Sequence, residues 1–73
     1  MTTREQTDAL ERALEGCIDS IGLGSTLSAV ADICAGKAEH IQTNWQDEAL
    51  AKRWLAAGKR IDALGMALGK EGF

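Results

Sequence analysis

The feature that most constrains this chain is a run of apolar residues in its C-terminal third, spaced alternately four and three residues apart. The run consists of Leu50, Trp54, Ala57, Ile61, Leu64 and Leu68. Because a helix turns by about 100° per residue, this spacing places all of these side chains on one face. Such a heptad pattern is typical of a helix that packs along another helix. It predicts a helix over residues 44–69, about 39 Å long at about 1.5 Å per residue.

The first of two earlier stripes predicts a helix that begins at Thr2 or Thr3. Its apolar positions are Leu10, Leu14, Cys17 and Ile21. Thr2 and Thr3 stand three residues before Glu5 and Gln6, which is the spacing of a capping box. Gly22 can adopt the left-handed conformation that ends a helix. The absence of proline and tyrosine from the whole chain also favours helix over sheet.

The second earlier stripe predicts a helix that follows Ser25, a favourable N-cap residue. The stripe consists of Leu27, Val30, Cys34, Ala38, Ile41 and Trp45. Because the connection to the first helix is short, we expect the first two helices to form an antiparallel hairpin. Gly36 weakens the second helix relative to alanine, and close approach of a neighbouring element would explain its presence.

The two tryptophans indicate where the second helix ends. Trp45 and Trp54 are nine residues apart, so in one straight helix they would point in opposite directions. Neither apolar stripe extends through residues 43–47 in phase. Asn44 is a strong N-cap residue in this segment. We therefore predict a change of helix phase near residues 43–47, as a turn or as a kink.

These patterns predict one all-α domain over residues 1–73, with an antiparallel hairpin and a longer third helix. A core formed by so short a chain rarely supplies more than about 3–5 kcal/mol. The third helix is also longer than the hairpin that would cover it. We therefore expect a dimeric helical bundle, in which two copies pair through their third helices. The residues expected to make this contact are Leu50, Trp54, Ile61, Leu64 and Leu68.

A row of mostly small residues lies beside the third stripe. It consists of Ala51, Leu55, Gly58, Gly65 and Gly69. Small side chains allow the backbones of two elements to come close together. The same glycines would also loosen the helix toward its end, and the sequence leaves both interpretations open.

Charge is unevenly distributed along the chain. Residues 1–50 carry nine acidic and three basic side chains, a net charge of -6, whereas residues 51–73 carry five basic and two acidic ones, a net charge of +3. The first half offers candidate residues for binding a protein partner: Asp8, Glu11, Glu15 and Asp19. A solvated helix face is the simpler interpretation of these acids. The second half could neutralise the first, or bind an acidic partner.

Nucleic acid is the alternative partner. A basic strip repeats at seven residues along the third helix: Lys52, Arg53, Lys59 and Arg60. Phosphate contacts depend on such strips. The pI near 4.9 of the whole chain argues against this interpretation.

Catalytic and metal-binding patterns are missing from the sequence. His40, Cys17 and Cys34 are the only soft ligands, and they lack the spacing of a zinc site. We expect both cysteines to be reduced core residues and His40 to be a solvated surface residue. No nucleophile has a base and an orienting group in a recognisable motif. The sequence therefore predicts a protein that is not an enzyme and that needs no metal or cofactor.

The N-terminal segment has neither a signal peptide pattern nor an apolar run long enough to cross a bilayer. A cytoplasmic location is therefore expected. The stretch "ICAGKAEHIQTNWQDEALAKRW" resembles short uncharacterised helical proteins of bacteriophages and other mobile elements, over roughly residues 27–64. This resemblance implies a small protein that binds and redirects a larger host or phage protein, as anti-CRISPR proteins do. We therefore expect a homodimeric interaction module that regulates or inhibits a protein partner.

Overall fold

The computed structural model describes residues 3–73, apart from the side chain of Trp45. A helix start at Thr2 and the predicted core position of Trp45 lie outside the described residues. The described part of the chain folds into three α-helices and one π-helical turn, and contains no strand. The helices are α1 (Arg4–Ile21), α2 (Leu23–His40) and α3 (Glu48–Lys70), and the π-helical turn η1 (Ile41–Trp45) follows α2. The predicted all-α class and the presence of three helices are thus confirmed.

A capping box starts α1, as its sequence indicates. The Thr3 hydroxyl accepts a hydrogen bond from the backbone N–H of Gln6 at 3.2 Å, and the Thr3 N–H donates to the side-chain oxygen of Gln6 at 2.9 Å. The helix ends at Gly22, which has a φ of 89° and donates to the carbonyl of Ile18 at 2.8 Å. Local sequence signals therefore determine both ends of this helix.

Only Gly22 separates α1 from α2. The Gly22 carbonyl accepts the first backbone hydrogen bond of α2, from the Thr26 N–H at 3.1 Å, and a second bond from the Thr26 hydroxyl at 2.8 Å. Gly22 is therefore the N-cap of α2 as well as the C-cap of α1. The prediction of Ser25 as the N-cap residue is therefore wrong. The helix starts three residues earlier than predicted, because glycine reaches a backbone conformation that other residues rarely adopt.

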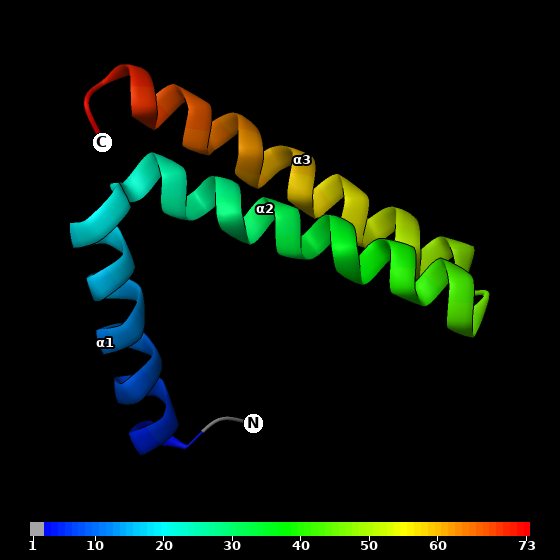
Figure 1. Cartoon of the computed structure of the whole chain (residues 1–73). Coiled ribbons are helices and arrows are strands. Elements are labelled where there is room, and N and C mark those ends of the chain that lie inside the picture. The colour runs from blue at the N-terminus through cyan, green and yellow to red at the C-terminus, as the bar shows by residue number, and fades with distance from the viewer. Residues whose placement is uncertain (1–2) are drawn as a thin grey trace.

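The predicted hairpin of the first two helices is also wrong. The chain changes direction by 119° between α1 and the helix formed by α2 and the start of η1, and α1 projects away from the rest of the molecule (Figure 1). The antiparallel pair consists instead of α2 and α3, which lie side by side along their lengths (Figure 1). A one-residue connection cannot reverse the chain between two helices, whereas the longer connection from α2 to α3 can.

The connection between α2 and α3 confirms the predicted change of helix phase. It does not confirm Asn44 as the N-cap residue of the third helix. Gln46 has a φ of 52°, in the left-handed region, and α3 begins after Asp47. The Asp47 carboxylate accepts a hydrogen bond from the Leu50 N–H at 3.0 Å. The side chain of Asn44, predicted to be the N-cap residue, instead donates to the His40 carbonyl one turn earlier, at 3.1 Å. The predicted boundary of the third helix therefore moves from residue 44 to residue 48.

Small residues form the contact between α2 and α3. They recur every seven residues in both helices and are all buried: Gly24, Ala31, Ala38, Ala51, Gly58 and Gly65. A Cβ atom built on Gly24 would lie 2.7 Å from the carbonyl oxygen of Gly65, and one built on Gly58 would lie 3.3 Å from that of Ala31. The two backbones are therefore in direct contact, which confirms the close-contact interpretation of Gly58 and Gly65.

Gly36 does not take part in this contact. It is exposed, and a Cβ atom built on it would meet nothing within 4 Å. The expectation that a neighbouring element approaches Gly36 is therefore wrong. Gly69 is exposed too, although its backbone N lies 3.1 Å from a Cβ atom built on Gly24.

The C-terminal end of the chain returns to the junction of α1 and α2 (Figure 1). The carbonyl of Phe73 accepts a hydrogen bond from the Gly24 N–H at 2.8 Å, and the Phe73 N–H donates to the Leu68 carbonyl at 3.0 Å. A Cβ atom built on Gly22 would lie 2.8 Å from the Phe73 carbonyl oxygen. The backbone on both sides of the junction is therefore closely packed.

Candidate protein-interaction surface

The large apolar side chains of the α2–α3 hairpin lie outside its core. The buried hydrophobic residues are Ala31, Cys34, Ala38 and Ala51. None of the described residues that are buried is larger than threonine or cysteine. In a heptad seam, the large apolar residues of α3 would form the contact with α2. Here they do not form the centre of that contact.

Helix geometry brings these larger residues to one face of the hairpin. All but Leu50 occur three or six residues after a buried small residue, which turns their direction about 60° or about 120° to the same side. Leu50 directly precedes Ala51 and is turned about 100° to that side. Equivalent positions of two antiparallel helices face the same side of the pair. We call the resulting surface the hairpin face. Its residues are Leu27, Val30, Ile41, Leu50, Trp54, Ala57, Ile61, Leu64 and Leu68.

The hairpin face is only partly covered. All five residues predicted for self-association lie on it: Leu50, Trp54, Ile61 and Leu68 are half-buried, and Leu64 is 54% exposed. A shallow hollow on this face is lined by Leu50, Trp54 and Ala57, with Arg53 at its edge. An apolar side chain of another element could occupy this hollow.

A second uncovered apolar surface lies on α1. None of the residues of this helix is buried, and Leu10, Leu14, Ile18 and Ile21 are 55%, 46%, 37% and 54% exposed. With Cys17 they lie within an arc of about 100° around the helix. We call these five residues the α1 face. The predicted stripe is thus present, but nothing within the described chain covers it.

The two cysteines have different environments. Cys34 is buried against α3, and a Cβ atom built on Gly58 would lie 3.1 Å from the Cys34 Cβ. Cys17 is exposed, so the expectation that it belongs to the core is wrong in this chain. Both thiols are free.

The acidic candidates surround the outer side of α1, and all of them are exposed. Glu11 lies only about 20° beyond Ile18 and therefore borders the α1 face, with Glu15 next to it. Asp8 and Asp19 lie about 20° and about 40° beyond Glu15, nearer the side opposite to the apolar arc. Only part of the predicted acidic set can therefore contact a partner that binds the α1 face.

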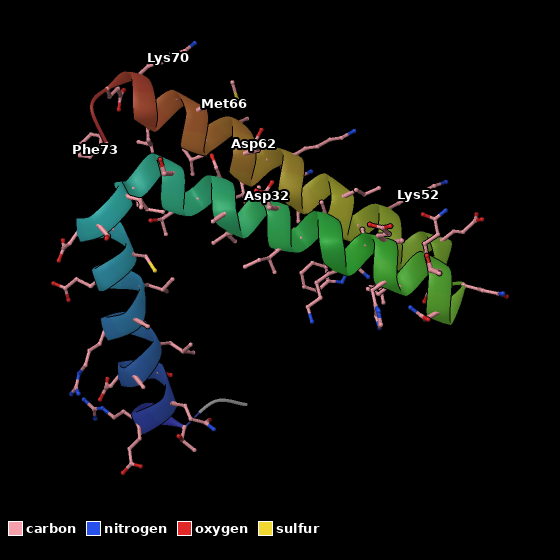
Figure 2. All side chains as sticks on the ribbon, in the orientation of Figure 1. Asp32, Lys52, Asp62, Met66, Lys70 and Phe73 are labelled. Atoms are coloured by element: carbon pink, nitrogen blue, oxygen red, sulfur yellow. The ribbon has the colours of Figure 1, made fainter. Side chains whose placement is uncertain are left out.

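The basic candidates are exposed and divide between two sides of α3. Arg53 lies at the edge of the hollow on the hairpin face, and Arg60 occupies the equivalent position seven residues later. Lys52 and Lys59 border depressions on the opposite side of the hairpin. Figure 2 shows Lys52 projecting from α3 on the side away from α2, as Met66 and Lys70 also do.

The charges of the two outer helices are opposite. Helix α1 carries five acidic and two basic side chains, a net charge of -3, and α3 carries five basic and two acidic ones, a net charge of +3. The two helices lie apart within one chain, because α1 projects away from the hairpin (Figure 1). Their charges are therefore free to interact with another molecule.

His40 takes part in a local contact, because its ring Nδ1 lies 3.0 Å from the side-chain nitrogen of Asn44. Within residues 3–73, no three His, Cys, Asp or Glu side chains form a group that could hold a metal ion. None of the described helices alone has the length and apolar character needed to cross a membrane. Helix α1 and the helix up to Asn44 meet these criteria only as a bent pair.

The apolar stripes of the sequence did not reveal the α2 side of the close contact, nor the place of Ile18 on the α1 face. Gly24, Ala31 and Ala38 are small residues seven apart, and the same period recurs at Ala51 and Gly58. This matched period was the signal that could have identified α2 and α3 as the packed pair. No protein-family model, curated protein or solved structure matches this chain significantly.

Proposed function

We propose that this chain is a cytoplasmic, non-enzymatic interaction module that forms a homodimer and regulates or inhibits a larger protein. The observation that carries the proposal is the presence of two uncovered apolar surfaces, the hairpin face and the α1 face. Stable monomers rarely leave contiguous apolar patches of this kind in water. Aromatic residues such as Trp54 contribute strongly when they are buried in an interface.

The charge distribution and the sequence resemblance support the regulatory part of this proposal. Asp8 and Asp19 lie away from the α1 face, so they stay accessible when that face is covered. They could bind a basic surface of the regulated protein. The resemblance to small helical proteins of bacteriophages and mobile elements favours the same class of function.

The dimer is tested by light scattering over a dilution series, on the wild-type protein and on Leu64→Glu. We expect a dimer for the wild type and at least about a tenfold higher dissociation constant for the variant. Burial of a leucine contributes about 1.5–3 kcal/mol, and a charge in its place would be desolvated.

Met66→Glu is the matched control. Met66 is 59% exposed, close to the 54% of Leu64, but it projects on the side of α3 away from α2 (Figure 2). This variant should dimerise like the wild type. A wild-type protein that stays monomeric at every concentration would refute the homodimer.

Nucleic acid is the second candidate partner, because all four basic residues of the strip are exposed. Under this alternative, binding to nucleic acid would weaken steeply with added salt and would be lost in Lys52→Glu/Arg60→Glu. Absence of binding at low salt would exclude it.

A further inference from the structure

We propose that the element covering the hairpin face is α1 of a second copy, and that the two chains exchange their α1 helices reciprocally. This inference rests on the homodimer proposed above and specifies its geometry. Each α1 face would pack on the hairpin face of the other chain. Both uncovered apolar surfaces would then be buried in the same contact.

The junction between α1 and α2 explains why the covering helix comes from another chain. Gly22 alone connects the two helices, and its N–H and carbonyl are both hydrogen-bonded, to Ile18 and Thr26. The Phe73 carbonyl packs against it on one side. Helix α1 is therefore held at a 119° change of direction from α2, and it cannot lie along the hairpin of its own chain.

Helix α1 and the hairpin face have matching lengths. Helix α1 has 18 residues, which corresponds to about 27 Å. The hairpin face extends along α3 from Leu50 to Leu68, which also corresponds to about 27 Å. One α1 helix is therefore long enough to lie along the whole hairpin face. Its α1 face, from Leu10 to Ile21, corresponds to about 17 Å of that length.

Charge favours α1 over α3 as the covering element. The α1 face is bordered by Glu11 and Glu15, and the hairpin face is bordered by Arg53 and Arg60. Reciprocal exchange would bring the helix with a net charge of -3 against the helix with a net charge of +3 twice in each dimer. Pairing of α3 with α3 would instead bring two helices with a net charge of +3 together.

The test uses two charge-reversed variants, Glu11→Lys/Glu15→Lys and Arg53→Glu/Arg60→Glu. In an exchanged dimer of either variant, both contacts would contain like charges, so each variant should dimerise at least about tenfold more weakly than the wild type. In a mixture, α1 of each chain would meet a complementary hairpin of the other chain. The heterodimer should therefore form with near wild-type affinity and exceed the statistical half of all dimers.

Native mass spectrometry, with one variant labelled with heavy nitrogen, measures the three dimers, and far-UV circular dichroism reports the helix content. Glu5→Lys/Asp19→Lys and Lys52→Glu/Lys59→Glu are matched controls, because they make the same changes of net charge on the sides of α1 and α3 away from the two faces. Each control should dimerise like the wild type, and their mixture should be close to statistical.

Two results would overturn the inference in different ways. If the wild type is a dimer and the border variants behave like their controls, α1 exchange is wrong and the homodimer stands. If the wild type is a monomer at every concentration, the homodimer fails and the exchange fails with it. Selective formation of the heterodimer by the border variants alone would establish the exchange.

Discussion

At the scale of single residues, the position of a glycine determines whether it stabilises or weakens this protein. Gly65 and Gly36 both lie within helices, yet a Cβ atom built on Gly65 would lie 2.9 Å from the backbone oxygen of Gly24, whereas one built on Gly36 would meet nothing within 4 Å. Two helices in backbone contact cannot accept an extra methyl group without moving apart. An exposed helical position gains stability from alanine.

We therefore expect opposite effects from two identical substitutions. Gly65→Ala should lower the free energy of unfolding by about 1–3 kcal/mol, because the α2–α3 contact must open. Gly36→Ala should raise it by up to about 1 kcal/mol. Urea unfolding at one fixed protein concentration measures both changes. Equal effects of the two substitutions would contradict the direct backbone contact between α2 and α3.

At the scale of secondary-structure elements, the start of α3 depends on one side chain. Asp47 accepts a hydrogen bond from the Leu50 N–H, and its negative charge lies at the positive end of the helix dipole. This cap follows Gln46, which adopts the left-handed conformation. That conformation interrupts the helical path, so the side chains of α3 do not continue the helical phase of η1. The cap therefore determines where the apolar stripe of α3 begins.

Asp47→Ala should lower the free energy of unfolding by about 0.5–2 kcal/mol, which is typical for loss of an N-cap side chain. Asp47→Ser should cost less, because its hydroxyl can still accept the hydrogen bond. Thermal unfolding followed by circular dichroism compares the two variants. A serine variant as unstable as the alanine variant would show that the capping hydrogen bond contributes little.

At the scale of the whole molecule, the one-residue connection between α1 and α2 controls which chain α1 can reach. Two antiparallel helices in one chain need a loop of about 2–5 residues between them. Gly22 is too short a connection for α1 to pack on its own hairpin face. The connection therefore favours association of two chains over closure of one.

Insertion of a flexible Gly-Ser-Gly-Ser-Gly segment between Gly22 and Leu23 should convert the dimer into a monomer. The inserted segment would let α1 reach the hairpin face of its own chain, where its effective concentration exceeds that of a second copy. Light scattering over a dilution series measures the mass. The same segment inserted after Gly72 is the control and should leave the dimer intact. An insertion at Gly22 that leaves the dissociation constant unchanged would contradict α1 exchange.

The sequence by itself determined the local features of this protein. The capping box at Thr3, the helix end at Gly22 and the change of phase near residues 43–47 depend on hydrogen bonds and backbone preferences within a few residues of each position. The all-α class follows from the helical spacing of apolar residues, which is also a local property of the sequence. Such interactions can be read from the sequence because their partners are adjacent in it.

The large apolar stripes left open which helices pair and which faces stay uncovered, and the tertiary structure decided both. The apolar residues spaced four and three apart on α3 show that one face of this helix is stabilised by contact with an apolar surface. They do not identify that surface. In the folded chain the small residues around Gly58 take the contact with α2, because two backbones can approach most closely there, and the large residues around Trp54 remain half-exposed. Pairing of this kind depends on the shapes of two surfaces far apart in sequence, and a periodic pattern in one of them does not contain that information.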